Sequence, residues 1–332
     1  MPELRKDPIT DRWVIISTER GRRPSDFLTI VEERKTKFSP FAPGNEDMTP
    51  PEIFAIRPDN SEPNTPGWTL RVIPNKYPAL TAEGQMNRNG EGMYDMMNGI
   101  GAHEVIIETA DSDKSLSDMD TSQVADVFRV FKDRIISLKK DIRLKYALVF
   151  KNYGHSAGAT LKHSHSQLIA TPIVPKRVAE EIDGAKDFFD QKERCVFCDI
   201  IRQEVRDDIR VVMDGEHFVV LEPFAARFPF ETWILPKQHS SHFEEINEDI
   251  IKHLAMTVKS VLQKLNAALQ TPPYNFVLHT APMQEEPMQH YHWHIEIMPK
   301  LTNIAGFEWG TGFYINPTSP EDAASFLKEI TV

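Results

Sequence analysis

The sequence predicts an α+β fold made of two copies of one unit, with mostly antiparallel sheets and one long helix in each half. The first observation is a repeat, because residues 104–172 align on residues 231–299 without a gap when the chain is shifted by 127 positions. The second is that both stretches show the same succession of a strand pattern, a helix pattern and two further strand patterns. The same architecture is therefore expected twice.

The first strand and the helix match closely between the copies. Short β-branched runs at 104–108 and 231–235 predict strands. The helix pattern is an apolar stripe in steps of three, four, four and three, and it pairs Val124 with Ile251, Val127 with Leu254, Phe131 with Val258, Ile135 with Leu262 and Leu138 with Leu265. Thr121 or Ser122 is expected to cap the first helix, and Asn247 the second.

Two further strands are expected in each copy. The first pair is predicted at 147–150 and 274–277, and a short polar loop follows each. Alternate positions of the last strands carry side chains with nitrogen atoms, namely His163, His165 and Gln167 in one copy and His290, His292 and His294 in the other. Because alternate residues of a strand face the same side, each copy is expected to present three such side chains in a row.

The copies differ in length upstream of the repeat. The similar segments 71–75 and 220–224 are offset by 149 positions, which indicates an insertion of 149 − 127 = 22 residues in the first copy. The stretch 83–99, rich in Gly, Asn and Met, is its expected place. A charged stretch at 185–193 predicts the boundary between an N-terminal domain of residues 1–190 and a C-terminal domain of residues 191–332.

Charge and hydropathy exclude several classes of protein. The 332 residues include 38 Lys and Arg against 49 Asp and Glu, so no overall positive field attracts nucleic acid or an anionic membrane. The N-terminus lacks the apolar segment of a signal peptide, and no apolar run approaches the roughly 18 residues of a membrane helix. We expect a cytoplasmic protein that meets anionic substrates with locally placed cations.

A turn rich in small residues precedes the first histidine run. It follows Asn152 and contains Ser156, Gly158 and Thr160, and such turns let backbone N–H groups approach phosphate oxygens. Imidazole is a competent nucleophile towards phosphorus near neutral pH and a good leaving group afterwards. A single histidine on a strand is most often structural, but two alternating histidines beside this turn favour phosphate chemistry.

Both cysteines of the chain lie in one Cys-x-x-Cys segment. Cys195 and Cys198 have the spacing of a zinc hook, of a redox pair or of two buried thiols. A thioredoxin-like βαβ context is missing around them, which favours zinc over redox chemistry. Two cysteines are too few for a disulfide framework.

The order of these features resembles the galactose-1-phosphate uridylyltransferase family, the transferase branch of the histidine-triad superfamily. The resemblance rests on the His-Ser-His-Ser-Gln run, the preceding loop and the duplication, and it extends over nearly the whole chain. It implies two histidine-triad-like units and a homodimer. Residues 12–16 and 20–24 resemble the family signature whose arginines meet nucleotide phosphates, which singles out Arg20 and Arg23; Asn75 lies in a segment that resembles the nucleoside-holding one.

The resemblance implies a nucleotidyltransferase of carbohydrate metabolism. His165 would attack the α-phosphorus of a nucleotide sugar, expel the sugar 1-phosphate and carry the nucleotide until a second phosphate takes it away. UDP-glucose and a hexose 1-phosphate are the expected substrates, as in galactose metabolism. Gln167, the loop amides and the arginines would stabilise charge on the transferring group, and His163 would orient the strand.

The resemblance also bears on metals. One zinc site of the family commonly contains two cysteines, but Ser39 and Ala42 stand at those positions here, so this site is predicted to be absent and His103 and His163 to be held by hydrogen bonds. A second, structural zinc site is expected in the C-terminal half, with Cys195, Cys198, His239 and His292 as ligands. His290 is the main alternative for the last ligand, and His242 and His294 are further ones.

The substrate stays open between two branches of the family. Ser164, where uridylyltransferases typically carry proline, and the segment 305–317 resemble the ADP-glucose phosphorylase subgroup, which transfers a nucleotide from an ADP-sugar to phosphate. A histidine-triad hydrolase and a zinc-stabilised nucleotide binder without activity are two further hypotheses. Transfer to a sugar phosphate would exclude the first of these, and turnover would exclude the second.

Overall fold

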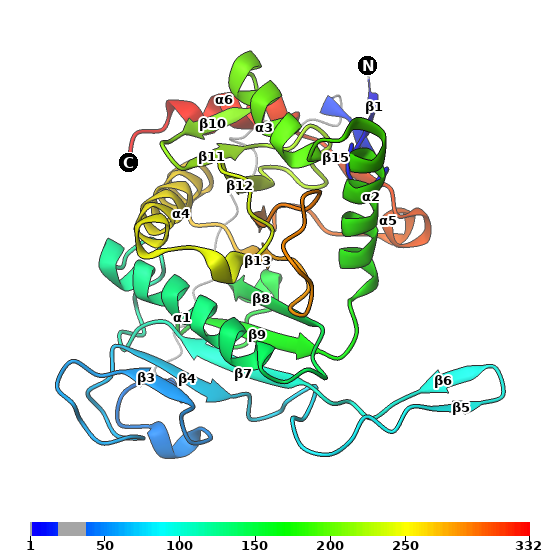
Figure 1. The fold of residues 1–332 in the computed structure, drawn as a ribbon. Coiled ribbons are helices and arrows are strands. Elements are labelled where there is room, and N and C mark those ends of the chain that lie inside the picture. Colours follow the sequence, from blue (N-terminus) through cyan, green and yellow to red (C-terminus); the bar gives the residue numbers. More distant parts are fainter. Residues whose placement is uncertain (1, 19–37) are drawn as a thin grey trace.

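The computed structural model describes residues 2–18 and 38–332. Its centre is one ten-stranded antiparallel sheet to which both halves of the chain contribute five strands each (Figure 1). A smaller sheet joins the N-terminal strands β1 (Glu3–Lys6) and β2 (Trp13–Ile16) to β15 (Tyr314–Asn316), which runs parallel to β2. The predicted α+β class with mostly antiparallel sheets is confirmed.

The strands of the two halves succeed one another in mirrored order across the large sheet. From one edge inwards, the first half contributes β3 (Phe54–Ile56), β4 (Leu70–Pro74), β7 (Ala102–Ile107), β9 (His165–Thr171) and β8 (Tyr146–Tyr153). From the other edge inwards, the second half contributes β10 (Val211–Asp214), β11 (Phe218–Leu221), β12 (Thr232–Pro236), β14 (His294–Pro299) and β13 (Tyr274–His279). The halves meet where β8 pairs with β13.

The predicted strands form, but the histidine runs begin later than expected. β9 starts at His165 and β14 at His294, so His163, His290 and His292 precede the strands. The alternation of side chains nevertheless continues through the extended backbone before each strand. Regular pairing stops there because the chain leaves the sheet to form the loops at 154–164 and 280–293.

The long helices α1 (Thr121–Lys139) and α4 (Glu248–Leu269) cover one face of the sheet, side by side (Figure 1). Their predicted apolar stripes lie in a single core shared with strands of both halves. Asn247 caps α4 by accepting a hydrogen bond from the backbone N–H of Ile250 at 3.0 Å, as predicted. The cap expected at Thr121 or Ser122 was wrong, because Asp120 is the last extended residue before α1.

The remaining helices surround the second half. Residues of α2 (Lys176–Lys192) and α3 (Val196–Asp207) form a second core with β11 and β12. Helices α5 (Gly306–Thr311) and α6 (Pro320–Glu329) follow the large sheet, and the described residues also contain the short 3₁₀ turns η3 (Glu46–Met48), η4 (His155–Ala157) and η5 (Phe243–Glu245). The predicted domain boundary at residue 190 falls at the end of α2 and stays a prediction.

The first half carries a projecting hairpin. Within the described part of the chain, strands β5 (Asn89–Glu91) and β6 (Tyr94–Met96) pair only with each other, and they extend away from the body of the molecule (Figure 1). The hairpin lies between β4 and β7, inside the stretch where the insertion was expected. Met93 at its tip is 96% exposed.

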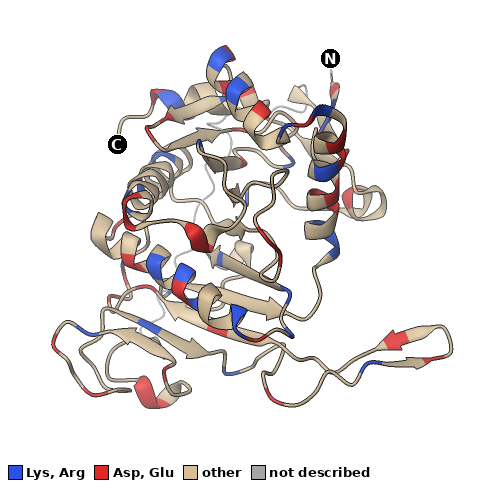
Figure 2. Cartoon of the chain, in the orientation of Figure 1, with Lys and Arg blue, Asp and Glu red and all other residues tan. Residues whose placement is uncertain are grey.

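Charges of both signs are distributed over the surface. Figure 2 shows lysines and arginines interspersed with acidic residues on α1 and α2. Among residues 2–18 and 38–332, no helix combines the length and the apolar character needed to span a bilayer.

Candidate nucleotidyl-transfer site and metal centre

His165 is the first residue of β9, and its ring is held in one orientation. Its Nδ1 lies 2.7 Å from the carbonyl oxygen of His163, so Nδ1–H donates and Nε2 keeps a lone pair. The residue is 8% exposed, and the ring of Phe41 lies edge-on to it with the centroids 5.4 Å apart. Burial, reinforced by the Lys151 ammonium, lowers the pKa of His165. The neutral, nucleophilic form is therefore favoured.

His163 uses both of its ring nitrogens in hydrogen bonds. Its Nε2 donates to the carbonyl oxygen of Thr109 at 2.7 Å, and its Nδ1 accepts from the Ser39 hydroxyl at 3.0 Å. Ser39 is one of the two positions where a thiolate was expected from the resemblance. Burial lowers the pKa of His163, which keeps the ring neutral. The predicted hydrogen bonding of His163 is thus present, with Ser39 as a partner.

Gln167 faces the same side of β9 as His165 and contacts two predicted residues. Its Oε1 accepts a hydrogen bond from His103 Nε2 at 2.8 Å and a longer one from Asn75 Nδ2 at 3.5 Å. His103 Nδ1 accepts from the amide of Ala79 at 3.2 Å, which fixes the ring. The carbonyl end of Gln167 is therefore occupied, and its amide group is the end that can donate to a ligand.

The loop between β8 and β9 differs in part from expectation. Asn152 is anchored, because its Oδ1 accepts from Asn275 Nδ2 at 2.8 Å. Ser156, Gly158 and Thr160 are exposed, and Gly158 has a left-handed φ of +93°. The amides of residues 157–159 already donate to carbonyl groups within the loop. Fewer loop amides are available to a phosphate than the sequence predicted, because the turn closes on itself.

Two of the predicted binding residues cannot be placed. Arg20 and Arg23 lie outside the described residues. Their predicted contact with nucleotide phosphates stays a prediction.

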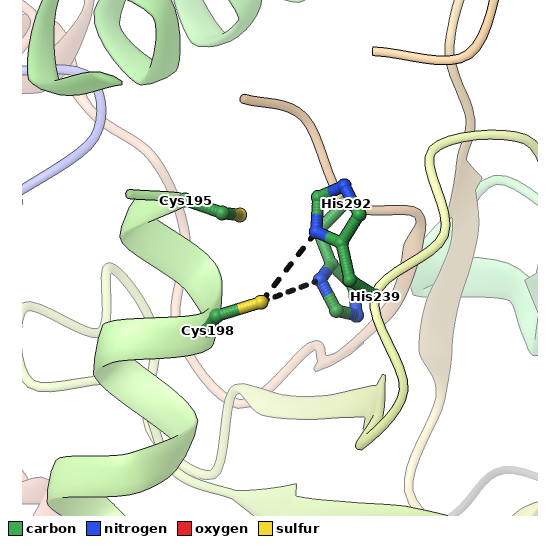
Figure 3. Close-up of side chains that lie close together, drawn as sticks. All are labelled: Cys195, Cys198, His239 and His292. Carbon is green, nitrogen blue, oxygen red and sulfur yellow. Dashed lines mark hydrogen bonds between the residues drawn. The ribbon is translucent and has the colours of Figure 1, made fainter. Parts of the chain in front are cut away.

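The predicted zinc ligands come together between α3 and the loops of the second half. The ligand atoms of Cys195, Cys198, His239 and His292 all lie within 4.8 Å of one another (Figure 3). Cys198 Sγ lies 3.5 Å from His239 Nδ1 and 3.7 Å from His292 Nδ1. The hydrogen bond from the Cys195 thiol lowers the pKa of the Cys198 thiol. A thiolate, the form that binds a metal, is therefore favoured at Cys198.

The hydrogen bonds of the Nε2 atoms of His239 and His292 are consistent with metal binding through Nδ1. His239 Nε2 donates to the carbonyl oxygen of Met288 at 3.0 Å, and His292 Nε2 donates to that of Pro236 at 2.8 Å. With Nε2 protonated, both Nδ1 atoms have a free lone pair beside the sulfur of Cys198. Two thiolates and two imidazoles are the donor set of a closed tetrahedral zinc site, so these residues fit zinc.

The structure corrects the register of the repeat at these histidines. In the first copy, His163 Nε2 donates to the carbonyl of Thr109, and His165 Nδ1 donates to that of His163. In the second copy, His292 Nε2 donates to the carbonyl of Pro236, and His294 Nδ1 donates to that of His292 at 3.1 Å. The offset here is 292 − 163 = 129, not 127. Pairing His163 with His290 was therefore wrong, because the loop before β14 contains two extra residues. His290 lies outside the cysteine–histidine cluster.

A second group of side chains that could hold a metal was not predicted from the sequence. It consists of Glu181, His279 and His294, of which only His294 had been considered. The rings of His279 and His294 are stacked with centroids 4.5 Å apart, and His279 Nδ1 lies 3.5 Å from Glu181 Oε2. The sequence offered His279 two residues beyond a predicted strand, whereas Glu181 comes from the distant helix α2. The described part of the chain thus offers more than one place for a metal.

Comparisons with known proteins agree with this geometry. The family model described as the N-terminal domain of galactose-1-phosphate uridyl transferase matches residues 1–175, and that of the C-terminal domain matches residues 181–328. An ADP-glucose phosphorylase from Arabidopsis thaliana is 41% identical over 100% of this chain and 93% of its own length. A galactose-1-phosphate uridylyltransferase from Thermotoga maritima is 33% identical over 100% of this chain and 99% of its own.

Solved structures show the same relationship. A crystal structure of an Arabidopsis thaliana ADP-glucose phosphorylase with bound ADP-glucose has a TM-score of 0.86 and 39% identity, and the match covers 100% of both chains. A solved uridylyltransferase has a TM-score of 0.77 and 28% identity, over 99% of this chain and 97% of its own. The chain belongs to the galactose-1-phosphate uridylyltransferase family of nucleotidyltransferases.

Proposed function

We propose that the protein moves a nucleoside monophosphate from a nucleotide sugar to a phosphate acceptor through a nucleotidyl-His165 intermediate. The tautomer and the burial of the His165 ring support this proposal. The bond from Nδ1–H of His165 to the carbonyl of His163 leaves Nε2 with its lone pair, and burial keeps the ring neutral. A neutral imidazole of fixed tautomer is an activated nucleophile for phosphoryl chemistry.

The transfer takes two displacements at phosphorus. In the first, Nε2 of His165 forms a bond to the α-phosphorus while the bond to the bridging oxygen breaks, and the sugar 1-phosphate leaves with that electron pair. In the second, an oxygen of the acceptor phosphate bonds to phosphorus and the N–P bond breaks, which returns the lone pair to Nε2. The carbonyl of His163 stabilises the positive charge that the ring acquires in between.

The surrounding residues have binding and orienting roles in this proposal. His163 orients the backbone that presents His165, and the amide group of Gln167 donates to an oxygen of the transferring phosphoryl group. The nucleotide sugar is bound by the remaining predicted residues, namely Arg20, Arg23, Asn75, Asn152, Ser156, Gly158 and Thr160.

Two substrate pairs follow from the relatives. The family name supports UDP-glucose as donor and a hexose 1-phosphate, such as galactose 1-phosphate, as acceptor. A second candidate is adenylyl transfer from ADP-glucose to phosphate, which is favoured by the 41% identity to the Arabidopsis thaliana ADP-glucose phosphorylase and by Ser164 in the histidine run. Both candidates use the same nucleophile and differ in base and acceptor.

Product analysis with each substrate pair tests the proposal. The purified protein and a His165→Ala variant are incubated with UDP-glucose plus galactose 1-phosphate and with ADP-glucose plus phosphate, and products are separated by ion-exchange chromatography. We expect UDP-galactose or ADP from the parent protein and neither from the variant. Formation of UMP or AMP alone would indicate a hydrolase, and nucleotide binding without any product would indicate a binder; either result would overturn the proposal.

We further propose one structural zinc ion, held by Cys195, Cys198, His239 and His292, which ties the start of α3 to the loop after β12 and the loop before β14. Four protein ligands leave no open position, so this metal would stabilise the fold and take no part in the transfer. The family's other zinc site is proposed to be absent, since Ser39 bonds to His163 instead. Reduced thiol ligands are typical of a cytoplasmic protein.

We also propose a homodimer with one nucleophile in each N-terminal domain. Exposed aromatic residues on α5, with Trp309 72% and Phe307 45% exposed, support a contact of this helix with a partner chain. The division into residues 1–190, with the nucleophile, and residues 191–332, with the zinc site, belongs to the same proposal.

A further inference from the structure

A buried ion pair contacts the start of β9, the strand that carries His165. Lys151 on β8 is 2% exposed, and Glu108, the residue after β7, is 1% exposed. Lys151 Nζ donates to Glu108 Oε2 at 2.6 Å, to Ser164 Oγ at 2.9 Å and to the carbonyl oxygen of His165 at 3.1 Å. The hydroxyls of Ser164 and Ser166 donate to the two oxygens of the Glu108 carboxylate. The two serines of the His-Ser-His-Ser-Gln run are thus both tied to one ion pair.

These bonds hold the strand at the point where its backbone pairing stops. The ladder between β7 and β9 ends with Ile107 opposite His165, and only the amide of Glu108, which donates to the carbonyl of Ser164 at 3.2 Å, continues it. Strand ends open more readily than strand centres. Lys151 and Glu108 attach the chain on both sides of His165, so the nucleophile stands on a fixed segment.

The second copy of the repeat has apolar side chains at the positions equivalent to this network. Leu278 stands where Lys151 does (278 − 151 = 127), and Trp293 and Ile295 stand where Ser164 and Ser166 do (293 − 164 = 295 − 166 = 129). All three lie in the apolar core beside α4. The fold therefore does not require a polar network here. Because burying two charges carries a desolvation cost, a network found only in the half with the nucleophile calls for a local reason.

We propose that Lys151, Glu108, Ser164 and Ser166 are positioning residues for His165, which hold its peptide so that Nε2 keeps one direction towards the α-phosphorus. The inference deepens the proposed function and rests on it. The charged and titratable groups that face His165 are Lys151 from β8, Glu108 from the end of β7 and His163 from its own segment. Lys151 and Glu108 act through His165 and have no contact with substrate in this proposal.

A pair of double variants tests the inference. Glu108→Gln/Lys151→Met removes both charges and leaves neither one unpaired. The control, Glu104→Gln/Arg134→Met, removes another ion pair of β7, in which Arg134 Nη2 lies 2.7 Å from Glu104 Oε1 and the side chains are 14% and 5% exposed. Ser164→Ala/Ser166→Ala is a milder variant that keeps the ion pair, and it serves if the first variant does not fold.

The rate of nucleotidylation and the apparent KM are measured for each protein in single turnovers with UDP-glucose and with ADP-glucose. We expect the Glu108/Lys151 variant to be about 100-fold slower with little change in KM, since small misplacements of a reacting group cost about that much. The serine variant should be about 10-fold slower, and the control should retain the parental rate although its melting temperature falls. Equal rates in the Glu108/Lys151 variant and the control would overturn the inference.

A second readout does not depend on turnover. In protein labelled with ¹⁵N-histidine, the His165 signals are identified by their loss in His165→Ala. We expect the Nδ1-protonated tautomer in the parent and in the control, and a mixture of tautomers in the Glu108/Lys151 and serine variants. A single tautomer in all proteins would overturn the inference. If the parent forms no adduct with either donor, the proposed function fails, and the tautomers still decide whether the network positions His165.

Discussion

At the scale of single residues, two histidines with the same backbone bond have different surroundings. His165 and His294 each donate from Nδ1 to the carbonyl of the histidine two residues earlier. His294 is fully buried, its Nε2 lies 3.9 Å from a Glu181 oxygen, and burial lowers its pKa to about 4. His165 is the first residue of β9, and its side chain is 8% exposed. The side chains around each ring, rather than the repeated backbone, decide which histidine can reach a substrate.

The pH dependence of nucleotidylation follows from the surroundings of His165. Burial lowers its pKa from the ordinary value of 6.5, so the ring stays neutral and nucleophilic below that pH. The rate of adduct formation is expected to hold as the pH falls past 6.5 and to decline only as the pH passes the lowered pKa. Quenched single-turnover reactions over a pH series measure this decline in rate at low pH. A half-maximal rate at or above pH 6.5 would contradict the expectation.

The residues of the site were predictable to different degrees. His165 and Gln167 were found because alternation and the adjoining loop are visible in the sequence. Lys151 and Glu108 were not, although Lys151 follows Ala147 and Val149 at a spacing of two and so belongs to the core-facing side of β8. Their pairing depends on two strands that lie beside β9, and a linear pattern does not state which strands are neighbours.

At the scale of elements, helix caps provide a direct comparison between the two copies. Asn247→Ala should reduce the free energy of unfolding by about 1 kcal/mol, because the amide of Ile250 loses its acceptor. Thr121→Ala should have an effect below about 0.5 kcal/mol, since Thr121 is already inside α1 and is not its cap. Urea unfolding of both variants measures the difference. Equal losses would contradict the cap assignment.

The metal centre gives a second prediction for elements. His292→Ala and Cys195→Ser should lose bound zinc and melt at lower temperature, because a structural metal contributes folding free energy. His290→Ala is the matched control, since His290 is a near neighbour outside the cluster. Metal content by mass spectrometry and thermal melting report the outcome. Loss of zinc in the His290 variant with retention in the His292 variant would reverse the ligand assignment.

The elements themselves were largely predictable, and their exact ends were not. The apolar stripes of both long helices were read correctly because spacings of three and four residues need no knowledge of the partner. The cap of α1 was misplaced because Asp120, Thr121 and Ser122 are successive polar residues of which any could cap. The register of β14 was misread because a two-residue difference in loop length leaves the alternation of histidines unchanged.

At the scale of the whole molecule, the two halves share one sheet and one core. β8 pairs with β13, and the apolar side chains of α1 and α4 belong to a single cluster. The protein is therefore expected to unfold in one calorimetric transition even though its sequence is duplicated. The control is the metal-free protein, which should unfold at lower temperature and still in one transition. Two separate transitions in the zinc-loaded protein would contradict the shared core.

The duplication was visible in the sequence, but the way the copies join was not. The repeat predicts two similar units, and it does not state that β8 and β13 become neighbours in one continuous sheet. That contact depends on the edge strand that each unit leaves unpaired. The repeat also does not reveal that the two copies differ in function. That difference depends on single side chains, such as Lys151 in one copy and Leu278 in the other, within a common backbone.

Intact-protein mass spectrometry can detect the covalent nucleotidylation of His165. The parent protein and His165→Ala are mixed briefly with UDP-glucose and, separately, with ADP-glucose, without an acceptor. A mass increase of one uridylyl or one adenylyl group on the parent alone is expected, and the base that appears identifies the donor. An adduct on both proteins, or on neither with either donor, would contradict the assignment of His165 as the nucleophile.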